Sequence, residues 1–213
     1  MKEFWETNFR AKQTMWGFRP VYAAMEMADL FHREGLKKIL IPGFGYGRNA
    51  AAFADKGASV TGIEISATAI HLARTHSNHP YTIFHGSVND MPFDEAQYDG
   101  IFCYALLHLL DAGERAQLLA NCYEQLKPNG LMVFLTISPQ TPAYGEGELL
   151  SEDRFLTKHG VKIFYYRAAS IQQDFGKYGL IRVEEVQEPP QAADNRSSQR
   201  FWQIICRKES QAY

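Results

Sequence analysis

Hydrophobic positions follow two different periods along this chain. Short apolar runs mark strands buried on both faces, and apolar residues recurring every three or four positions mark helices with one buried face. The runs predict strands at 38–41, 59–63, 81–85, 98–104 and 131–137. The longer period predicts helices at 20–35, 49–56, 66–74 and 114–126. Strands and helices that alternate in this way predict a parallel sheet.

The pattern changes after Pro139. A helix is predicted over 168–178, followed by strands at 180–186 and 201–206 that a long polar loop connects. Two strands with no helix between them are expected to form an antiparallel pair at the sheet edge. The predicted fold class is α/β and Rossmann-like: a doubly wound, mostly parallel seven-stranded sheet with an antiparallel C-terminal strand pair.

Three glycines directly follow the first predicted strand. Gly43, Gly45 and Gly47 are spaced by two, and Glu64 closes the second strand. Glycine has no Cβ, so the backbone can approach a ligand closely. An acid about 20 residues after the first glycine accepts hydrogen bonds from ribose hydroxyls in nucleotide-binding βαβ units. The pattern predicts an adenosine-containing cofactor, with a solvated strand-end acid as the alternative for Glu64.

The spacing of the glycines separates two kinds of cofactor. Dinucleotide sites read G-x-G-x-x-G, whereas here the third glycine comes one place early and Arg48 follows it. A G-x-G-x-G loop after a strand is typical of class I S-adenosylmethionine (AdoMet) methyltransferases. Two further motifs follow in the order of that class: Met91-Pro92-Phe93 ahead of Tyr98-Asp99, and a predicted turn at 126–130 ahead of the fifth strand. The chain resembles this class over nearly its full length.

Two groups within the class are similar to this sequence. Gly47-Arg48-Asn49 resembles the tellurite-resistance methyltransferases, and Pro42-Gly43-x-Gly45 resembles the thiopurine, thiol and halide methyltransferases. Both groups tend to carry an N-terminal segment like Phe4-Trp5-Glu6 with a later Trp-Gly pair, here Trp16-Gly17. In such enzymes that segment folds over cofactor and substrate. The resemblance implies a single methyltransferase domain, 1–213, with an N-terminal lid and helix (1–35), a cofactor-binding core (36–138) and an acceptor-side part (139–213).

The resemblance also implies a cofactor, a class of acceptor and a set of site residues. The cofactor is AdoMet, and the acceptor is a small soft nucleophile: a thiol, a halide or a chalcogen oxyanion. Two positions depart from the usual pattern of the class: Ile41 replaces an acid before the first glycine, and Ser87 replaces the adenine-binding acid. The expected cofactor-binding residues are Trp16, Gly43, Gly45, Gly47, Glu64, Ile65, Ser87, Val88 and Tyr104.

No essential base stands out in the sequence. This agrees with a thiol acceptor, because a thiol needs little activation near neutral pH. Tyr104, which ends the fourth predicted strand, and His108, which lies just beyond it, are the catalytic candidates, since ligands sit at that end of the strands in open α/β sheets. Glu146 and Glu148 occupy a glycine-rich loop that could instead be plain acidic surface. The alternatives are an O- or N-methyltransferase that uses His108 or a loop acid as base, a non-catalytic AdoMet-binding protein, and a nicotinamide-dependent oxidoreductase.

Composition excludes several other classes of protein. The 213 residues carry a net charge of −2 and no long basic run, so no nucleic-acid partner is expected. No apolar run approaches about 20 residues and no signal peptide is apparent, so no membrane partner is expected. Three widely spaced cysteines and the isolated His76–His79 pair predict neither disulfide nor metal. The expected location is cytoplasmic, and the oligomeric state stays open.

Overall fold

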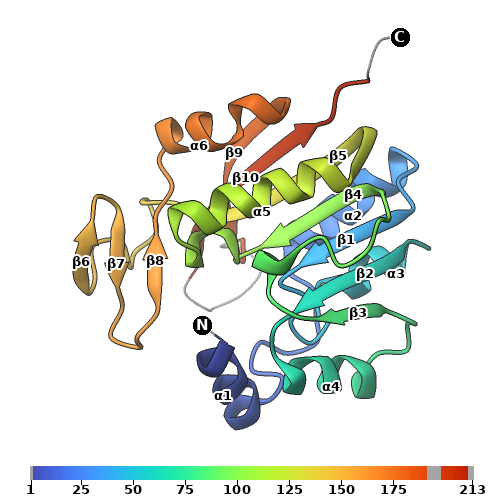
Figure 1. Cartoon of the computed structure of the whole chain (residues 1–213). Helices are drawn as coiled ribbons and strands as arrows, with labels where there is room; N and C mark the ends of the chain where they lie inside the picture. The colour runs from blue at the N-terminus through green and yellow to red at the C-terminus, as the bar shows by residue number, and fades with distance from the viewer. Residues whose placement is uncertain (1, 191–197, 211–213) are drawn as a thin grey trace. The chain divides into compact units, whose positions relative to one another are not determined.

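A computed structural model describes residues 2–190 and 198–210 of the chain (Figure 1). The chain divides into two compact units, 1–102 and 103–213. The first unit holds α1 (Lys2–Lys12), α2 (Tyr22–Arg33), β1 (Lys38–Pro42), α3 (Ala50–Ala54), β2 (Ser59–Glu64), α4 (Ala67–His76), β3 (Thr82–His85), the 3-10 turn η1 (Val88–Asp90) and most of β4 (Tyr98–Tyr104). The second unit holds η2 (Leu107–Leu109), α5 (Ala112–Gln125), β5 (Leu126–Ile137), β6 (Glu148–Ser151), β7 (Arg154–Leu156), β8 (Lys162–Phe164), α6 (Ala168–Phe175), η3 (Gly176–Tyr178), β9 (Leu180–Glu188) and β10 (Gln199–Arg207).

The main sheet has seven strands in the order β3-β2-β1-β4-β5-β10-β9. β1 pairs in parallel with both β2 and β4, and β10 pairs antiparallel with both β5 and β9. This arrangement confirms the predicted fold class, including the antiparallel C-terminal pair. Part of the predicted loop between the last two strands, residues 191–197, lies outside the described residues.

Helix α2 shows how the apolar pattern becomes packing in the first unit. Its buried face carries Met27 and Phe31, both about as buried as any residue of the protein. The Phe31 ring lies where a side chain on Gly100 of β4 would stand: an added Cβ would come within 2.6 Å of it. Gly100 therefore lets a large aromatic side chain lie against the sheet.

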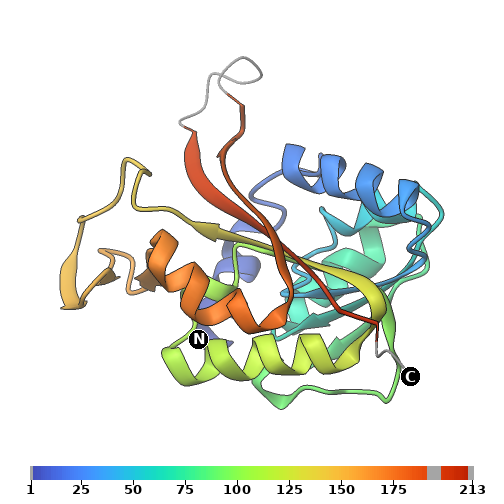
Figure 2. The ribbon, with the colours of Figure 1, turned by 90° about the horizontal axis from the view of Figure 1, so that it is seen from above.

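In the second unit, β5 is buried from Leu131 to Ile137, as its unbroken apolar run predicts. Helices α5 and α6 lie side by side (Figure 2), and Arg115 of α5 pairs with Asp174 of α6. All three cysteines, Cys103, Cys122 and Cys206, are free and buried.

Two expectations about local structure are wrong, and one element was not predicted. The predicted turn at 127–130 belongs to β5, because Asn129 donates to Lys208 and Lys208 donates to Gly130, which extends the pairing with the last strand. The supposed loop after β5 contains a separate three-stranded antiparallel sheet, β6-β7-β8. The N-terminal segment begins with helix α1, which the apolar pattern does not predict.

Helix length adds one further observation. Within the described ranges, no helix is long and apolar enough to cross a membrane.

Candidate functional site

The glycine loop leaves the end of β1 through three left-handed residues. Gly43, Gly45 and Gly47 have φ values of 72°, 59° and 82°, a region that favours glycine. The amides of Gly43 and Phe44 both donate to the carbonyl of Ile63, which ties the loop to β2. A Cβ added at Gly45 would meet no protein atom within 4 Å. The turn at Gly45 therefore borders open space that a ligand can approach.

Glu64 at the end of β2 holds this loop in place. Its Oε2 accepts from the Gly45 amide at 2.7 Å, and its Oε1 accepts from the Ser66 amide at 2.8 Å. The side chain is 6% exposed, and this burial raises the pKa of the carboxyl while the amide hydrogen bonds oppose the rise. Each carboxylate oxygen can accept a second hydrogen bond. Glu64 is therefore able to bind a hydroxyl group while it holds the loop.

Three more of the predicted residues, Ile65, Ser87 and Val88, follow the ends of β2 and β3. The Gly86 amide donates to the Glu64 carbonyl at 3.0 Å, which places the start of the Ser87–Val88 segment beside Glu64. The Ser87 hydroxyl accepts from the Asn89 amide, so it already caps η1, and Val88 is buried. His85 donates from Nε2 to the Ile65 carbonyl at 3.2 Å. The ends of β1, β2 and β3 thus bring together the predicted residues of the first unit from Gly43 to Val88.

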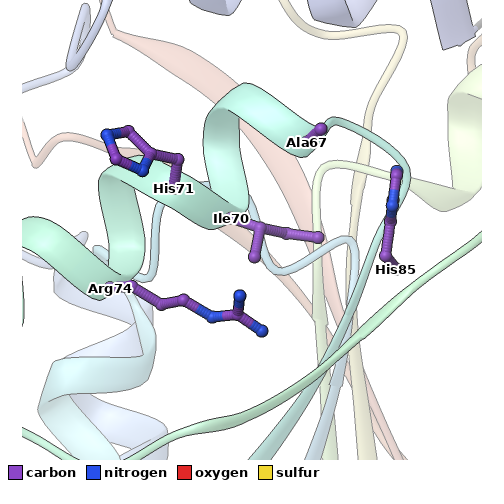
Figure 3. Close-up of a pocket in the computed structure, with 5 residues that line it drawn as sticks. All are labelled: Ala67, Ile70, His71, Arg74 and His85. Atoms are coloured by element: carbon purple, nitrogen blue, oxygen red, sulfur yellow. The ribbon is translucent and has the colours of Figure 1, made fainter.

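A shallow hollow of about 190 Å³ lies against α4 and the end of β3. Arg74 and His85 flank Ile70, whereas His71 points away from them (Figure 3). Ala67 completes the lining, and none of the predicted site residues takes part in it. The hollow is therefore distinct from the loop at Gly45.

Trp16 is fastened to the glycine loop itself. Its ring stacks on Tyr46 with centroids 6.1 Å apart and an interplanar angle of 13°. The Tyr46 hydroxyl accepts from the Trp16 amide and donates to the Gly17 carbonyl, and Arg48 donates to the Trp16 carbonyl at 3.0 Å. The sequence pointed to Trp16 but not to Tyr46, although Tyr46 stands between two of the loop glycines.

Helix α1 reaches the same site through Glu6 and lies beside α4 (Figure 1). The Glu6 carboxylate accepts from the Ser66 hydroxyl at 2.7 Å and from the Thr68 hydroxyl at 2.6 Å, and it pairs with Arg10. The Ser66 hydroxyl in turn accepts from the Ala69 amide, which makes Ser66 the N-cap of α4. Ser66 therefore links Glu6 to Glu64, a role that its residue type alone does not reveal.

We expect Glu6→Ala to lower stability by about 1–2 kcal/mol, since it removes charge-assisted bonds at the start of α4. For a protein of this size that is a fall in Tm of about 2–8 °C. The Ser66 and Thr68 hydroxyls lower the pKa of Glu6 to about 2. The stabilisation is therefore present above the ordinary carboxyl pKa and is lost as pH falls toward 2.

Thermal melts at neutral pH and near pH 2 test this expectation, with Glu3→Ala on the exposed side of the same helix as the control. The gap between wild type and Glu6→Ala should narrow in acid. A gap of equal size at both pH values would contradict an ionic role for Glu6.

Tyr104 and His108 lie in the second unit. The Tyr104 ring is 5.4 Å from that of Phe201, and His108 is 6.3 Å from the same ring. Nδ1 of His108 accepts from the Ile137 amide at 3.2 Å, and burial lowers the pKa of His108 to about 3. Tyr104 and His108 therefore share Phe201 as a neighbour.

The glycine-rich loop after β5 is tied to the small sheet of the second unit. Glu146 of this loop and Glu148, the first residue of β6, are exposed. The buried Asp153 carboxylate binds Arg167 and the Tyr144 hydroxyl, with distances of 2.6–2.8 Å. This network fixes the small sheet to the segment that carries the two acids.

Comparison with known proteins agrees with this geometry. The family model described as Methyltransferase domain matches residues 39–130, the stretch that holds the glycine loop and Glu64. A ubiquinone biosynthesis O-methyltransferase of Coxiella burnetii is 31% identical over 111 residues, which are 51% of this chain and 47% of that protein. One from Aromatoleum aromaticum is 29% identical over 153 residues, 68% of this chain and 64% of that protein. The chain spans about half the length of the first relatives that it matches.

Solved structures extend the likeness to the whole chain. The CcbJ methyltransferase of Streptomyces caelestis matches with a TM-score of 0.73 at 20% identity, covering 99% of this chain and all of that one. A Burkholderia thailandensis 1,6-didemethyltoxoflavin-N1-methyltransferase, solved with S-adenosylhomocysteine, matches with a TM-score of 0.72 at 17% identity, covering 98% and 87%. TehB from Haemophilus influenzae gives 0.68 at 16% identity, covering 96% and 67%. The chain therefore shares the fold of these methyltransferases.

Proposed function

We propose that the protein is an AdoMet-dependent methyltransferase that acts on a small-molecule acceptor. The observation that carries the proposal is the Glu64 carboxylate, held between the Gly45 and Ser66 amides beside a glycine turn open to a ligand. A buried acid at this position with unused acceptor capacity suits a pair of ribose hydroxyls. The methyltransferase-domain match over the same residues supports the proposal.

The residues present fit the proposed cofactor. A side chain at Gly45 would fill the space that the cofactor would use, and the loop offers backbone groups at close range. Ser87 keeps its O–H donor while its oxygen caps η1, so it can still donate to an adenine nitrogen. The Ile65 carbonyl is engaged by His85, which sets the path of the chain after Glu64.

Bound AdoMet would supply the electrophilic methyl group. The work left to the protein is to align the acceptor with that group and to exclude water. Glu64 and the glycine loop would fix the cofactor, and the aromatic wall of Trp16 and Tyr46 would shield it. Tyr104 and His108 are the residues proposed to face the acceptor.

A soft nucleophile such as a thiol, a halide or a chalcogen oxyanion is the proposed acceptor, since the buried His108 accepts a hydrogen bond at Nδ1 from the Ile137 amide and so does not offer that nitrogen as a free base. An O-methyltransferase acting on a small metabolite is the second candidate. The names of the Coxiella and Aromatoleum relatives favour it.

A methyl-transfer screen over thiols, iodide, selenium and tellurium oxyanions, phenols and amines separates the two candidates. Calorimetry with AdoMet and NAD separates both from an oxidoreductase. Tight AdoMet binding without turnover of any acceptor in the screen would favour a non-catalytic binding protein.

We expect Glu64→Ala to weaken AdoMet binding by about 1–3 kcal/mol, because it leaves ribose hydroxyls and two loop amides without their partner. Isothermal titration calorimetry measures the loss. The control is Glu26→Ala, which removes an exposed acid from α2. Unchanged affinity in a folded Glu64→Ala variant would remove Glu64 from the site.

A further inference from the structure

His108 is held on the short turn that follows β4. β4 ends at Tyr104, and Ala105 takes a left-handed conformation with φ of 55°. The Ala105 amide donates to Leu135 of β5 at 2.9 Å, so the turn is anchored to the sheet. His108 then sits on η2 with 5% of its surface exposed. Its ring is therefore fixed at the carboxyl end of β4, where ligands of such sheets bind.

The hydrogen bonds of His108 define which ring nitrogen carries the proton. The Ile137 backbone amide donates to Nδ1 at 3.2 Å, and the Thr136 hydroxyl lies 3.4 Å from the same nitrogen. A backbone amide can only donate, so Nδ1 must be an acceptor without a hydrogen. In a neutral imidazole the single proton then lies on Nε2.

Nε2 is therefore a donor with no lone pair. Among the described residues, none accepts a hydrogen bond from Nε2. This nitrogen is also not fully enclosed by protein atoms, so a ligand can reach it. A proton cannot be taken up at Nε2, and the lone pair of Nδ1 is engaged by the Ile137 amide. The ring can offer a hydrogen bond but cannot act as a base.

We propose that His108 holds an oxygen atom of the methyl acceptor through its Nε2–H and does not deprotonate the acceptor. The inference rests on the proposed methyltransferase function. It makes His108 an acceptor-binding residue, and it narrows the acceptor to a molecule that joins a nucleophilic atom to a non-reacting oxygen.

The surroundings of His108 keep its ring neutral. Burial lowers the pKa of His108 to about 3. η2 packs against α5, β5 and β8, which carry the charged side chains Glu114, Arg115 and Glu124 on α5, Lys127 on β5 and Lys162 on β8. Arg115 donates to the Leu110 carbonyl and pairs with Asp174, and Lys162 is exposed. The carboxylates nearest in sequence, Asp111 and Glu114, bond to each other's backbone amides in the capping box of α5, and burial is the cause of the lowered pKa of His108.

The chemistry of methyl transfer explains why the oxygen must be a non-reacting one. A hydrogen bond to the attacking atom would tie up its electron density and slow the displacement. The nucleophile's lone pair forms the new bond to carbon, and the electrons of the broken carbon–sulfur bond stay on sulfur. An acceptor that enters as its anion loses its charge and releases no proton. A chalcogen oxyanion or a thiolate with a neighbouring carboxylate or carbonyl meets these conditions.

The tautomer can be tested without turnover. In protein labelled with ¹⁵N-histidine, two-bond proton–nitrogen correlation shows which ring nitrogens are protonated, and His108→Asn assigns the signal among the seven histidines. We expect a proton on Nε2 alone, unchanged from about pH 5 to about pH 8. A proton on Nδ1, or a titration within that range, would overturn the inference.

Two substitutions separate the two sides of the ring. His108→Asn places an amide oxygen near Nδ1 and keeps an acceptor for Ile137, whereas His108→Gln extends an amide donor toward the position of Nε2. For an oxygen-bearing acceptor, we expect His108→Asn to raise KM about tenfold with a smaller change in kcat. His108→Gln should retain more of the affinity, and iodide, which has no oxygen, should show a smaller loss than the oxygen-bearing acceptor.

Each other outcome has a definite meaning. Equal loss of kcat in both variants, together with loss of an acidic limb in the pH profile, would make His108 a base. A normal His108→Asn beside an unstable His108→Gln would make the residue structural. Failure of wild type to bind AdoMet would contradict the proposed function, while the NMR result would still decide the state of His108.

Discussion

Gly45→Val is expected to abolish AdoMet binding, with a loss of at least about 100-fold, while the protein still folds. Any side chain at Gly45 would project into the open space beside the Glu64 carboxylate, because an added Cβ there meets no protein atom within 4 Å. A valine also resists the left-handed backbone of Gly45, which would pull its amide away from Glu64. Calorimetric titration with AdoMet and with its demethylated product measures the loss.

Gly35→Val provides the matched control. Gly35 follows α2 with φ of 72° and also has open surroundings, so valine there brings the same backbone strain without approaching the loop. Both variants should melt at similarly lowered temperatures, and only Gly45→Val should lose the ligand. A Gly45→Val protein that binds within about threefold of wild type would mean that the loop does not approach the cofactor.

The parallel core could be predicted because its signals are local. Strand β4 occurs at Tyr98–Tyr104 as its apolar run predicts, and β1, β2 and β3 differ from their predicted limits by a single residue at one end. Ser66 caps α4 through its own hydroxyl, which needs only the residue type and its place before a helix. Such features depend on neighbours in sequence, so a pattern reveals them.

The elements that the sequence did not predict depend on distant contacts. Helix α1 buries only Phe9, and it gains its anchor from Glu6, which bonds to Ser66 and Thr68. The small sheet β6-β7-β8 has short strands, and Asp153 and Arg167 secure it from separate segments. A pattern confined to neighbouring residues carries no trace of such pairs.

The candidate site divides in the same way. Residue type and spacing pointed to Gly45 and Glu64, whereas the amide partners that orient Glu64 emerge only when β1 and β2 are paired. The Tyr46 hydroxyl bonds to both Trp16 and Gly17 and so ties them to the glycine loop, and a pattern of apolar positions likewise does not predict this contact. The sequence therefore points to the candidate binding groups, and the fold shows which partners orient them.

We expect the N-terminal segment, residues 8–20, to become more ordered when the cofactor binds. Trp16 and Phe18 are 43% and 55% exposed, an unusual state for large aromatic side chains that pack against a glycine loop. Their link to the loop runs through the Tyr46 hydroxyl, so a ligand that orders the loop should also order this segment. Amide hydrogen exchange across residues 8–20 should slow when AdoMet or its demethylated product binds. Exchange in α2 should not change and serves as the internal control.

Removal of the segment should cost most of the turnover. Deletion of residues 1–18 exposes Tyr46 and Leu72, which pack with the buried Phe9, and it strips Glu6 from the start of α4. The deletion therefore lowers stability as well, so the sharper variant is Trp16→Ala, which keeps α1 and Glu6 in place. We expect Trp16→Ala to fold and to lose about tenfold or more in kcat/KM, as loss of a gating segment does. Full turnover by Trp16→Ala, together with exchange that ignores the ligand, would show that the segment only packs against the loop.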